Sequence, residues 1–233
     1  MYVLGIDLET TGLSFEEDEI IEIGAVVWDT DSNKPAAMLN HLVIQQHKLP
    51  LSDTIVNITG ITDTDLTEFG VDERVALNEF LKLAEKCQYI VAHNGNYFDK
   101  PFLEKALSRH SLKLNLPWID TMFDVPFKSG TKTLTYLAAE HNFLNPFAHR
   151  ALFDVLTMLK VCSDYDWQEI VKRSQSPQVR VIAKVSKEDR QQAKDKGFRW
   201  DPNNYVWFKE MKECDLDTSQ FEFEVQLKKE SDA

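Results

Sequence analysis

The 233-residue chain lacks several features that would place it in a specialised class of protein. It has only three cysteines, Cys87, Cys162 and Cys214, which show no metal-binding spacing and are odd in number. We therefore expect free, mostly buried thiols and a reducing compartment, the cytoplasm. No apolar run approaches the roughly 20 residues of a membrane-spanning helix, and the start MYVLGID has no basic region or cleavage site, so we expect no signal peptide.

The sequence also lacks an excess of positive charge. Its formal net charge is −12, from 26 basic and 38 acidic residues. This argues against a protein that binds nucleic acid by bulk electrostatics alone. It does not argue against an enzyme that reaches phosphate groups through divalent metal ions, because such a site concentrates acids and the ions invert the local field.

Apolar periodicity predicts an α/β domain in the N-terminal part of the chain. Runs rich in Ile and Val predict strands, and apolar residues at helical spacing predict helices. The expected strands cover residues 2–9, 20–30, 38–45, 89–95 and 117–123, and the expected helices cover 71–87, 96–110, 133–142 and 150–165. Strands first, then alternating strands and helices, favour a mixed sheet flanked by helices.

A second, smaller domain is expected after a linker at KRSQSPQ. We place a first domain over residues 1–172 and a small β-α-β-β accessory module over 178–230. The module has a strand, a helix with Ser186 as N-cap and Gly197 just after its end, the hairpin FRWDPNNYVWF and the alternating strand QFEFEVQLK. Residues 1–175 carry 15 basic and 26 acidic side chains, so the acidity belongs to the first domain.

Five polar side chains stand out as candidates for chemistry. Asp7 and Glu9, at i and i+2 of a strand in GIDLETTGL, project from the same face and repel each other, although a solvated strand edge explains such a pair taken alone. Asp154 lies in an otherwise apolar helix, an unusual place for an unpaired carboxylate. Taken alone, Asp99 is explained by a first-turn acid that complements a helix dipole, which is a common case, and His149 by a solvated loop histidine, the usual fate of a single histidine.

Three segments together resemble the motifs of the DEDD superfamily of 3′–5′ exonucleases, in its histidine-type, DnaQ-like branch (DNA polymerase III epsilon subunit-like). DLETTG resembles D-x-E-T-T-G, HNGNYFDKPFL resembles H-N-x-x-F-D-x-x-F-L, and HRALFDV resembles H-x-A-x-x-D. The likeness spans residues 1 to about 165, in matching order and spacing. It implies a ribonuclease H-like exonuclease fold, with a mixed five-stranded sheet flanked by helices.

The resemblance implies a metal-dependent 3′–5′ exonuclease that releases nucleoside 5′-monophosphates from single-stranded 3′ ends, of DNA in the first instance. Two Mg²⁺ or Mn²⁺ ions would be held by Asp7, Glu9, Asp99 and Asp154. Asp7 would bridge both ions, Glu9 and Asp154 would hold the ion that activates water, and Asp99 would serve the second ion. His149 would act as the general base.

Substrate contacts are expected beside the same motifs. Thr10 and Gly12 would offer backbone N–H groups to the terminal nucleotide, and Asn94 would donate to a phosphate oxygen. Leu13 and Phe98 either contact the last base or simply pack in the core.

Two further segments carry weaker indications. Lys128 and Lys132 offer either a phosphate contact or a solvated loop. The tail hairpin is similar to small G-x-x-W-D … W modules appended to some DNA-processing proteins. Its aromatic residues favour a mini-core, with a nucleic-acid stacking platform or a docking surface as alternatives; these residues are Phe198, Trp200, Tyr205 and Trp207.

Two rival functions stay open at this point. One is an exoribonuclease of the ribonuclease T or oligoribonuclease type, because no residue pattern distinguishes a ribose from a deoxyribose. The other is a recruitment subunit whose tail engages a polymerase or repair complex. Proofreading, DNA repair and a homodimer are also left open.

Overall fold

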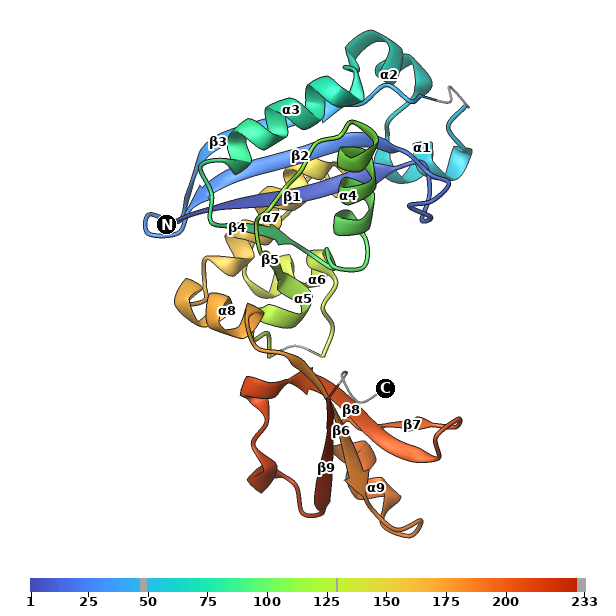
Figure 1. The fold of residues 1–233 in the computed structure, drawn as a ribbon, viewed down its shortest axis with the longest axis vertical. Coiled ribbons are helices and arrows are strands. Elements are labelled where there is room, and N and C mark those ends of the chain that lie inside the picture. The colour runs from blue at the N-terminus through green and yellow to red at the C-terminus, as the bar shows by residue number, and fades with distance from the viewer. Residues whose placement is uncertain (47–49, 129, 230–233) are drawn as a thin grey trace. The chain divides into compact units, whose positions relative to one another are not determined.

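The chain folds into two compact units, Met1–Val171 and Lys172–Ala233, each of which is described by itself (Figure 1). The computed structural model describes residues 1–46, 50–128 and 130–229. Within these residues, no helix combines the length and apolar character needed to traverse a bilayer.

A mixed five-stranded sheet forms the centre of the first unit, in the order β3-β2-β1-β4-β5. β1 pairs antiparallel with β2 and parallel with β4, β2 pairs antiparallel with β3, and β4 pairs parallel with β5. The predicted fold class is confirmed. The strands are β1 (Tyr2–Thr10), β2 (Ile20–Asp29), β3 (Lys34–Leu42), β4 (Tyr89–Ala92) and β5 (Trp118–Asp120).

The four predicted helices are present in this unit as α3, α4, α6 and α7, and additional short helices lie before, between and after them. The expected helix over 96–110 begins only at Asp99, and the expected third strand begins and ends earlier than predicted. Four of the described helices were not predicted: α1, α2, α5 and α8. The strand expected over 117–123 ends at Asp120, and residues 121–124 form α5 instead. The helices are α1 (Asp53–Thr59), α2 (Asp63–Phe69), α3 (Glu73–Ala84), α4 (Asp99–Arg109), α5 (Thr121–Asp124), α6 (Leu134–Glu140), α7 (Ala151–Cys162) and α8 (Trp167–Ser174).

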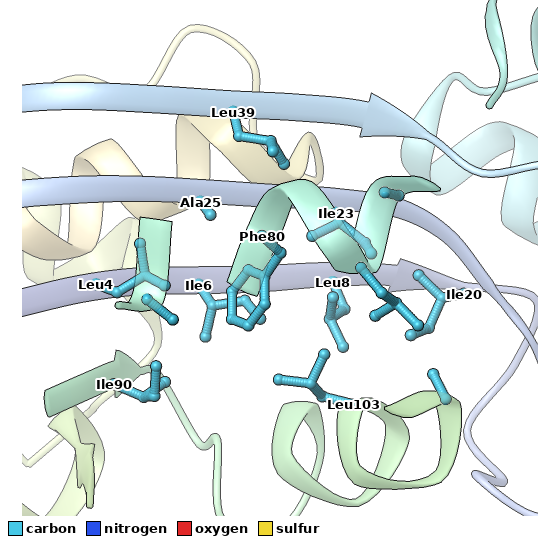
Figure 2. Close-up of a cluster of buried hydrophobic side chains, with 14 of the residues drawn as sticks. Leu4, Ile6, Leu8, Ile20, Ile23, Ala25, Leu39, Phe80, Ile90 and Leu103 are labelled. Atoms are coloured by element: carbon cyan, nitrogen blue, oxygen red, sulfur yellow. The ribbon is translucent and has the colours of Figure 1, made fainter. Parts of the chain in front are cut away.

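Strand β1 alternates between two hydrophobic clusters on opposite faces of the sheet. Leu4, Ile6 and Leu8 belong to a buried cluster with side chains of α3 and α4, among them Phe80 and Leu103 (Figure 2). The neighbouring Val3 belongs to the other cluster, with side chains of α7 and α8. Because strand side chains alternate in direction, Asp7 and Glu9 project to the α7 face.

Two glycines let α7 lie directly against the sheet. Gly24 of β2 stands opposite Asp7 in the ladder, and a Cβ atom on it would lie 2.4 Å from backbone atoms of Ala151 and Leu152. A Cβ on Gly5 would lie 2.7 Å from side-chain atoms of α7. The first turn of α7 is therefore brought close to the C-terminal half of β1.

The second unit is a four-stranded antiparallel sheet in the order β7-β8-β6-β9, with one short helix. The helix begins at Arg190 with Asp189 as its N-cap, so the prediction of Ser186 as N-cap is wrong. The Ser186 hydroxyl accepts the Asp189 N–H (3.1 Å) in the turn before the helix. Gly197 follows its end at φ 81°, as expected. The elements are β6 (Gln178–Lys184), α9 (Arg190–Asp195), β7 (Arg199–Asp201), β8 (Val206–Lys212), two 3₁₀ turns (Glu213–Asp215 and Thr218–Gln220) and β9 (Glu224–Lys229).

The aromatic residues of the tail hairpin divide into two groups. Phe198 is buried, and Trp207 packs against the small core around it, as the mini-core interpretation predicts. Trp200 is 45% exposed and Tyr205 is 79% exposed, so that interpretation is wrong for these two residues.

We predict that Gly24→Ala destabilises the first unit and displaces α7. The new methyl group would lie 2.4 Å from backbone atoms of α7, and backbone atoms cannot rotate away as a side chain can. The free energy of unfolding should therefore fall by about 1–3 kcal/mol. Urea unfolding measures this change. Gly130→Ala is the matched control, because its Cβ would meet no atom within 4 Å. Equal stability of the two variants would contradict the close approach.

Candidate active site

Three carboxylates from two elements converge on the α7 face of the sheet. One oxygen from each of Asp7, Glu9 and Asp154 lies within 4.8 Å of the others. Asp7 and Glu9 come from β1, and Asp154 comes from the first turn of α7. The structure thus brings together acids that lie about 145 residues apart in the sequence.

Burial and mutual repulsion favour the protonated form of these acids. Burial raises the pKa of Asp7 well above its usual range, and the charge of Asp99 adds to the effect. Burial and the neighbouring Glu22 raise the pKa of Glu9 to about 8, and burial raises that of Asp154. A divalent cation would remove this repulsion. Because the donor set consists of carboxylate oxygens, the residues present fit a hard ion such as Mg²⁺ or Mn²⁺.

The segment before α7 is tied to Asp154. The His149 N–H donates to Asp154 Oδ2 (2.7 Å), and Asn145 Nδ2 donates to Oδ1 (2.8 Å). His149 has a positive φ of 63°, which turns the chain at this point, and its side chain is exposed. Sequence reasoning missed Asn145, since a single asparagine in a loop gives no signal of its own.

Asp99 reaches the sheet from the start of α4 and lies outside the group of three acids. Its Oδ1 accepts the Leu8 N–H (3.0 Å). Since β1 pairs with β4 only over Val3–Gly5, this N–H lies beyond the end of that ladder. Burial raises the pKa of Asp99 to about 8. Its first-turn position fits a helix-dipole role, but its burial and its bond to β1 distinguish it from a solvated helix acid.

An ion pair between the buried Glu22 and the partly exposed Arg150 fixes the start of α7, and sequence reasoning missed it. Glu22 lies opposite Glu9 in the ladder and is fully buried. Arg150 donates to it through Nε (3.2 Å) and Nη2 (2.8 Å), and the Ala151 N–H adds a bond of 3.0 Å. Arg150 and Glu22 are 128 residues apart, and neither sequence segment indicates the other.

Asp120 shapes the turn that precedes α4 and was also missed. Its carboxylate accepts the N–H groups of Asn94 and Asn96, each at 3.0 Å. Asn94 takes a positive φ of 63° in this turn. The acid lies at the end of β5, where the sequence predicted only a short strand.

The expected substrate residues lie at the end of β1 and at the start of α4. Thr10 is buried, and its hydroxyl donates to the Gly12 carbonyl (2.6 Å). Leu13 is 87% exposed, so the core-packing interpretation is wrong for this residue. Phe98 is half-buried beside Phe102, with ring centroids 5.1 Å apart, so packing accounts for part of its surface.

The two loop lysines differ in their surroundings. Lys128 is exposed, as expected for a solvated loop. The Lys132 ammonium donates to the Met122 carbonyl and lies 5.8 Å from the centre of the Phe123 ring. The Lys132 carbonyl in turn accepts a hydrogen bond from His93 (2.7 Å) if Nε2 carries the proton. Lys132 thus has a structural role in this loop.

The fold and the acid cluster define a DnaQ-like nuclease class, and comparison with known proteins places the chain within it. Residues 4–162 match a family described as "Exonuclease", and the chain belongs to this family, as a DEDDh-type exonuclease domain. Residues 180–227 match a domain of unknown function.

Two relatives illustrate the range of the family. DNA polymerase III PolC-type of Mycoplasma genitalium is 33% identical over 165 residues, which cover 66% of this chain and 11% of that protein. Ribonuclease T of Yersinia pseudotuberculosis is 32% identical over 179 residues, covering 69% of this chain and 82% of that protein. The chain thus matches about a tenth of the length of its PolC-type relative.

Solved structures share the fold at low sequence identity. Exonuclease I of E. coli in complex with a dA16 oligonucleotide has a TM-score of 0.63 at 16% identity, covering 78% of this chain and 48% of that one. The nuclease domain of 3′hExo, described as a DEDDh family member bound to rAMP, has a TM-score of 0.58 at 18% identity, covering 70% and 90%.

We predict that Mg²⁺ stabilises the chain more strongly as pH rises. Glu9 and Asp99 have pKa values of about 8 in the fold and about 4 when unfolded. The folded metal-free chain therefore binds more protons across this window, and its free energy of unfolding falls as pH rises from about 4 to about 8. A cation needs the deprotonated acids, so the Mg²⁺-induced rise in Tm should be larger near pH 8.5 than near pH 6.

Thermal unfolding in EDTA and in Mg²⁺ measures this difference. Asp7→Asn is the control, because it removes one carboxylate of the acid cluster and should reduce the Mg²⁺ effect at every pH. An equal rise in Tm at both pH values in the unsubstituted chain would contradict the prediction.

Proposed function

We propose that this chain is a metal-dependent 3′–5′ exonuclease that removes nucleoside 5′-monophosphates from the 3′ end of single-stranded DNA. The observation that carries the proposal is the convergence of Asp7, Glu9 and Asp154 within 4.8 Å in an exonuclease-family domain. The PolC-type relative and the oligonucleotide complex of exonuclease I favour DNA as the substrate.

Four acids would hold the metal ions. Asp7, Glu9 and Asp154 would supply oxygen ligands directly, and Asp99 would contribute from α4. Two bound Mg²⁺ or Mn²⁺ ions supply Lewis-acid activation of water and compensate the charge on the leaving oxygen. Zn²⁺ should replace them poorly, because its sites usually include nitrogen or sulfur ligands.

His149 would take the proton from the attacking water. A histidine suits this role because imidazole exchanges protons near neutral pH. Its backbone bond to Asp154 links the position of the loop to the acid cluster, and the exposed ring has access to bulk water for proton release.

The substrate end would lie beside the end of β1. Leu13 has the exposure needed to contact the terminal base, and Phe98 would offer the open part of its ring on the other side. Thr10 and Gly12 would offer backbone N–H groups, and Asn94 would donate to a phosphate oxygen. Contacts of this kind tolerate any base, which the removal of successive nucleotides from an arbitrary sequence requires.

An exoribonuclease is the second candidate, and two comparisons favour it. Ribonuclease T matches this chain over 82% of its own length, whereas the PolC-type protein matches over 11%. The solved 3′hExo domain is described as bound to rAMP. Both candidates use the same acids, so only the sugar preference separates them.

We predict that the chain with Mg²⁺ shortens a 5′-labelled single-stranded DNA oligomer from its 3′ end, and that EDTA and Asp7→Asn each abolish this. The reason is that an Asp7 oxygen lies within 4.8 Å of an oxygen of each of the other two acids, so Asp7 would share a metal ion with them. A denaturing gel, with a matched RNA oligomer in a parallel arm, measures the products. A ladder from RNA alone would replace DNA with RNA as the substrate. Undiminished activity of Asp7→Asn would contradict the assigned centre, and no degradation by the unsubstituted chain would favour a recruitment subunit.

We predict that His149→Ala lowers kcat by about 10²- to 10⁴-fold and leaves Mg²⁺ affinity nearly unchanged. The ring would act on water, while the acids would hold the metal. Single-turnover rates give the chemical step, and the Mg²⁺-dependent rise in Tm gives the affinity. His41→Ala, at an ion pair with Glu79, is the matched control and should keep full activity. Equal loss of rate and affinity in His149→Ala would make His149 a metal ligand.

A further inference from the structure

We infer that the C-terminal unit carries a binding site of its own for single-stranded nucleic acid, in the groove beside Trp200 and Trp207. The groove has a volume of about 1240 Å³ and is formed by the end of β6, the loop that follows it, α9 and the β7–β8 hairpin. All of its lining residues belong to this unit, so the inference does not depend on catalysis in the first unit.

Exposed aromatic rings line one side of this groove. Trp200 pairs with Trp207 across the hairpin, and their ring centroids are 5.5 Å apart at an interplanar angle of 54°. Tyr205 lies at the turn, 6.3 Å from Trp200. Trp207 is anchored in the small core, whereas Trp200 and Tyr205 are open to solvent. Exposed indole and phenol rings held on a fixed hairpin are suited to stacking against bases, which is tolerant of sequence.

The charge of the groove is opposite to that of the chain. Every charged residue among those that line it, in the described part of the chain, is basic: Lys184, Lys187, Arg190, Lys194 and Arg199. The chain as a whole has a net charge of −12. A groove whose charged lining residues are all basic would attract a polyanion, whereas the net negative charge of the chain would repel it elsewhere.

Cations and rings are also placed next to each other. The Lys194 ammonium lies 5.6 Å from the centre of the Trp207 ring. Arg199 contributes less, because it lies 3.8 Å from Glu210 and 5.4 Å from the centre of the Phe208 ring. A cation beside a ring in the groove could meet a phosphate and a base of the same strand.

Nucleic acid fits this combination better than an acidic peptide does. A run of Glu or Asp would satisfy the lysines, but it has no flat group to cover Trp200 and Tyr205. A free phosphate would likewise leave the rings in water. Single-stranded DNA and RNA both supply bases and phosphates, and the groove residues give no contact that selects the sugar.

The test is the binding of the full chain to 5′-fluorescein-labelled dT8 and rU8 in EDTA, followed by fluorescence anisotropy. Trp200→Ala should raise Kd by about fivefold or more, the effect of losing one stacked base. Lys194→Gln should reduce the slope of log Kd against log salt by about 0.7, the value for one phosphate contact on a single strand. The matched controls are Phe69→Ala, at a 68% exposed ring, and Lys228→Gln, at an exposed lysine outside the groove.

A second readout locates the contact directly. Photocrosslinking with an oligomer that carries 5-iodouracil, followed by mass spectrometry, should label Trp200 or Tyr205. Crosslinks confined to residues 1–171, or equal Kd values for Trp200→Ala and Phe69→Ala, would overturn the proposal. Equal competition by a poly-glutamate peptide of the same charge would also overturn it and assign the groove to acidic peptides. Binding in EDTA is measured without turnover, so these outcomes are separate from failure of the exonuclease assay.

Discussion

The candidate active site depends on how closely α7 approaches the middle of the sheet. Gly24 and Gly5 leave no side chain between the strands and the helix, so the first turn of α7 lies over the face that carries Asp7. The carboxylates that meet there repel one another, which opposes the packing. Burial of apolar side chains from α7 and α8 against Val3 and Val26, together with the Glu22–Arg150 pair, offsets this repulsion.

Neighbouring acids on one face of the sheet have different partners. Glu22 is bonded to Arg150 and to the Ala151 N–H, so its oxygens are engaged by the protein. Glu9, its partner across the ladder, lies with Asp7 and Asp154 in the group of three. One strand position thus holds the helix in place, while the position opposite faces the acid cluster. Removal of Arg150 would leave the buried Glu22 carboxylate without its counter-charge, so the pair is required for the geometry in which the other acids are crowded.

Local sequence patterns predicted much of this arrangement. The i, i+2 spacing of Asp7 and Glu9 places both on one strand face, and the apolar surroundings of Asp154 marked it as unusual. The resemblance of three separate segments to exonuclease motifs predicted that their acids share one site. The fold class followed from the order of apolar strands and helices.

Features that depend on distant partners could not be predicted in this way. Glu22 gains its role only because Arg150, 128 residues later, reaches it, and Asp120 gains its role from a turn that another strand supplies. The short helices α1 and α2 begin at the side-chain caps Ser52 and Thr62 and are only 7 residues long, too short for a periodic signal. Exposure of Leu13 and Trp200 likewise depends on packing that sequence alone does not specify.

Because the Leu8 N–H donates a hydrogen bond to Asp99, substitutions of the different acids should change the stability of the fold in different directions. Replacing Asp7 or Glu9 by an uncharged residue relieves the repulsion between carboxylates. A lineage that is no longer selected for catalysis would therefore gain stability by losing either carboxylate. Loss of Asp99 instead leaves a buried backbone donor without an acceptor, at a cost of about 1–3 kcal/mol. In inactive descendants of this domain, Asp99 should therefore outlast Asp7 and Glu9.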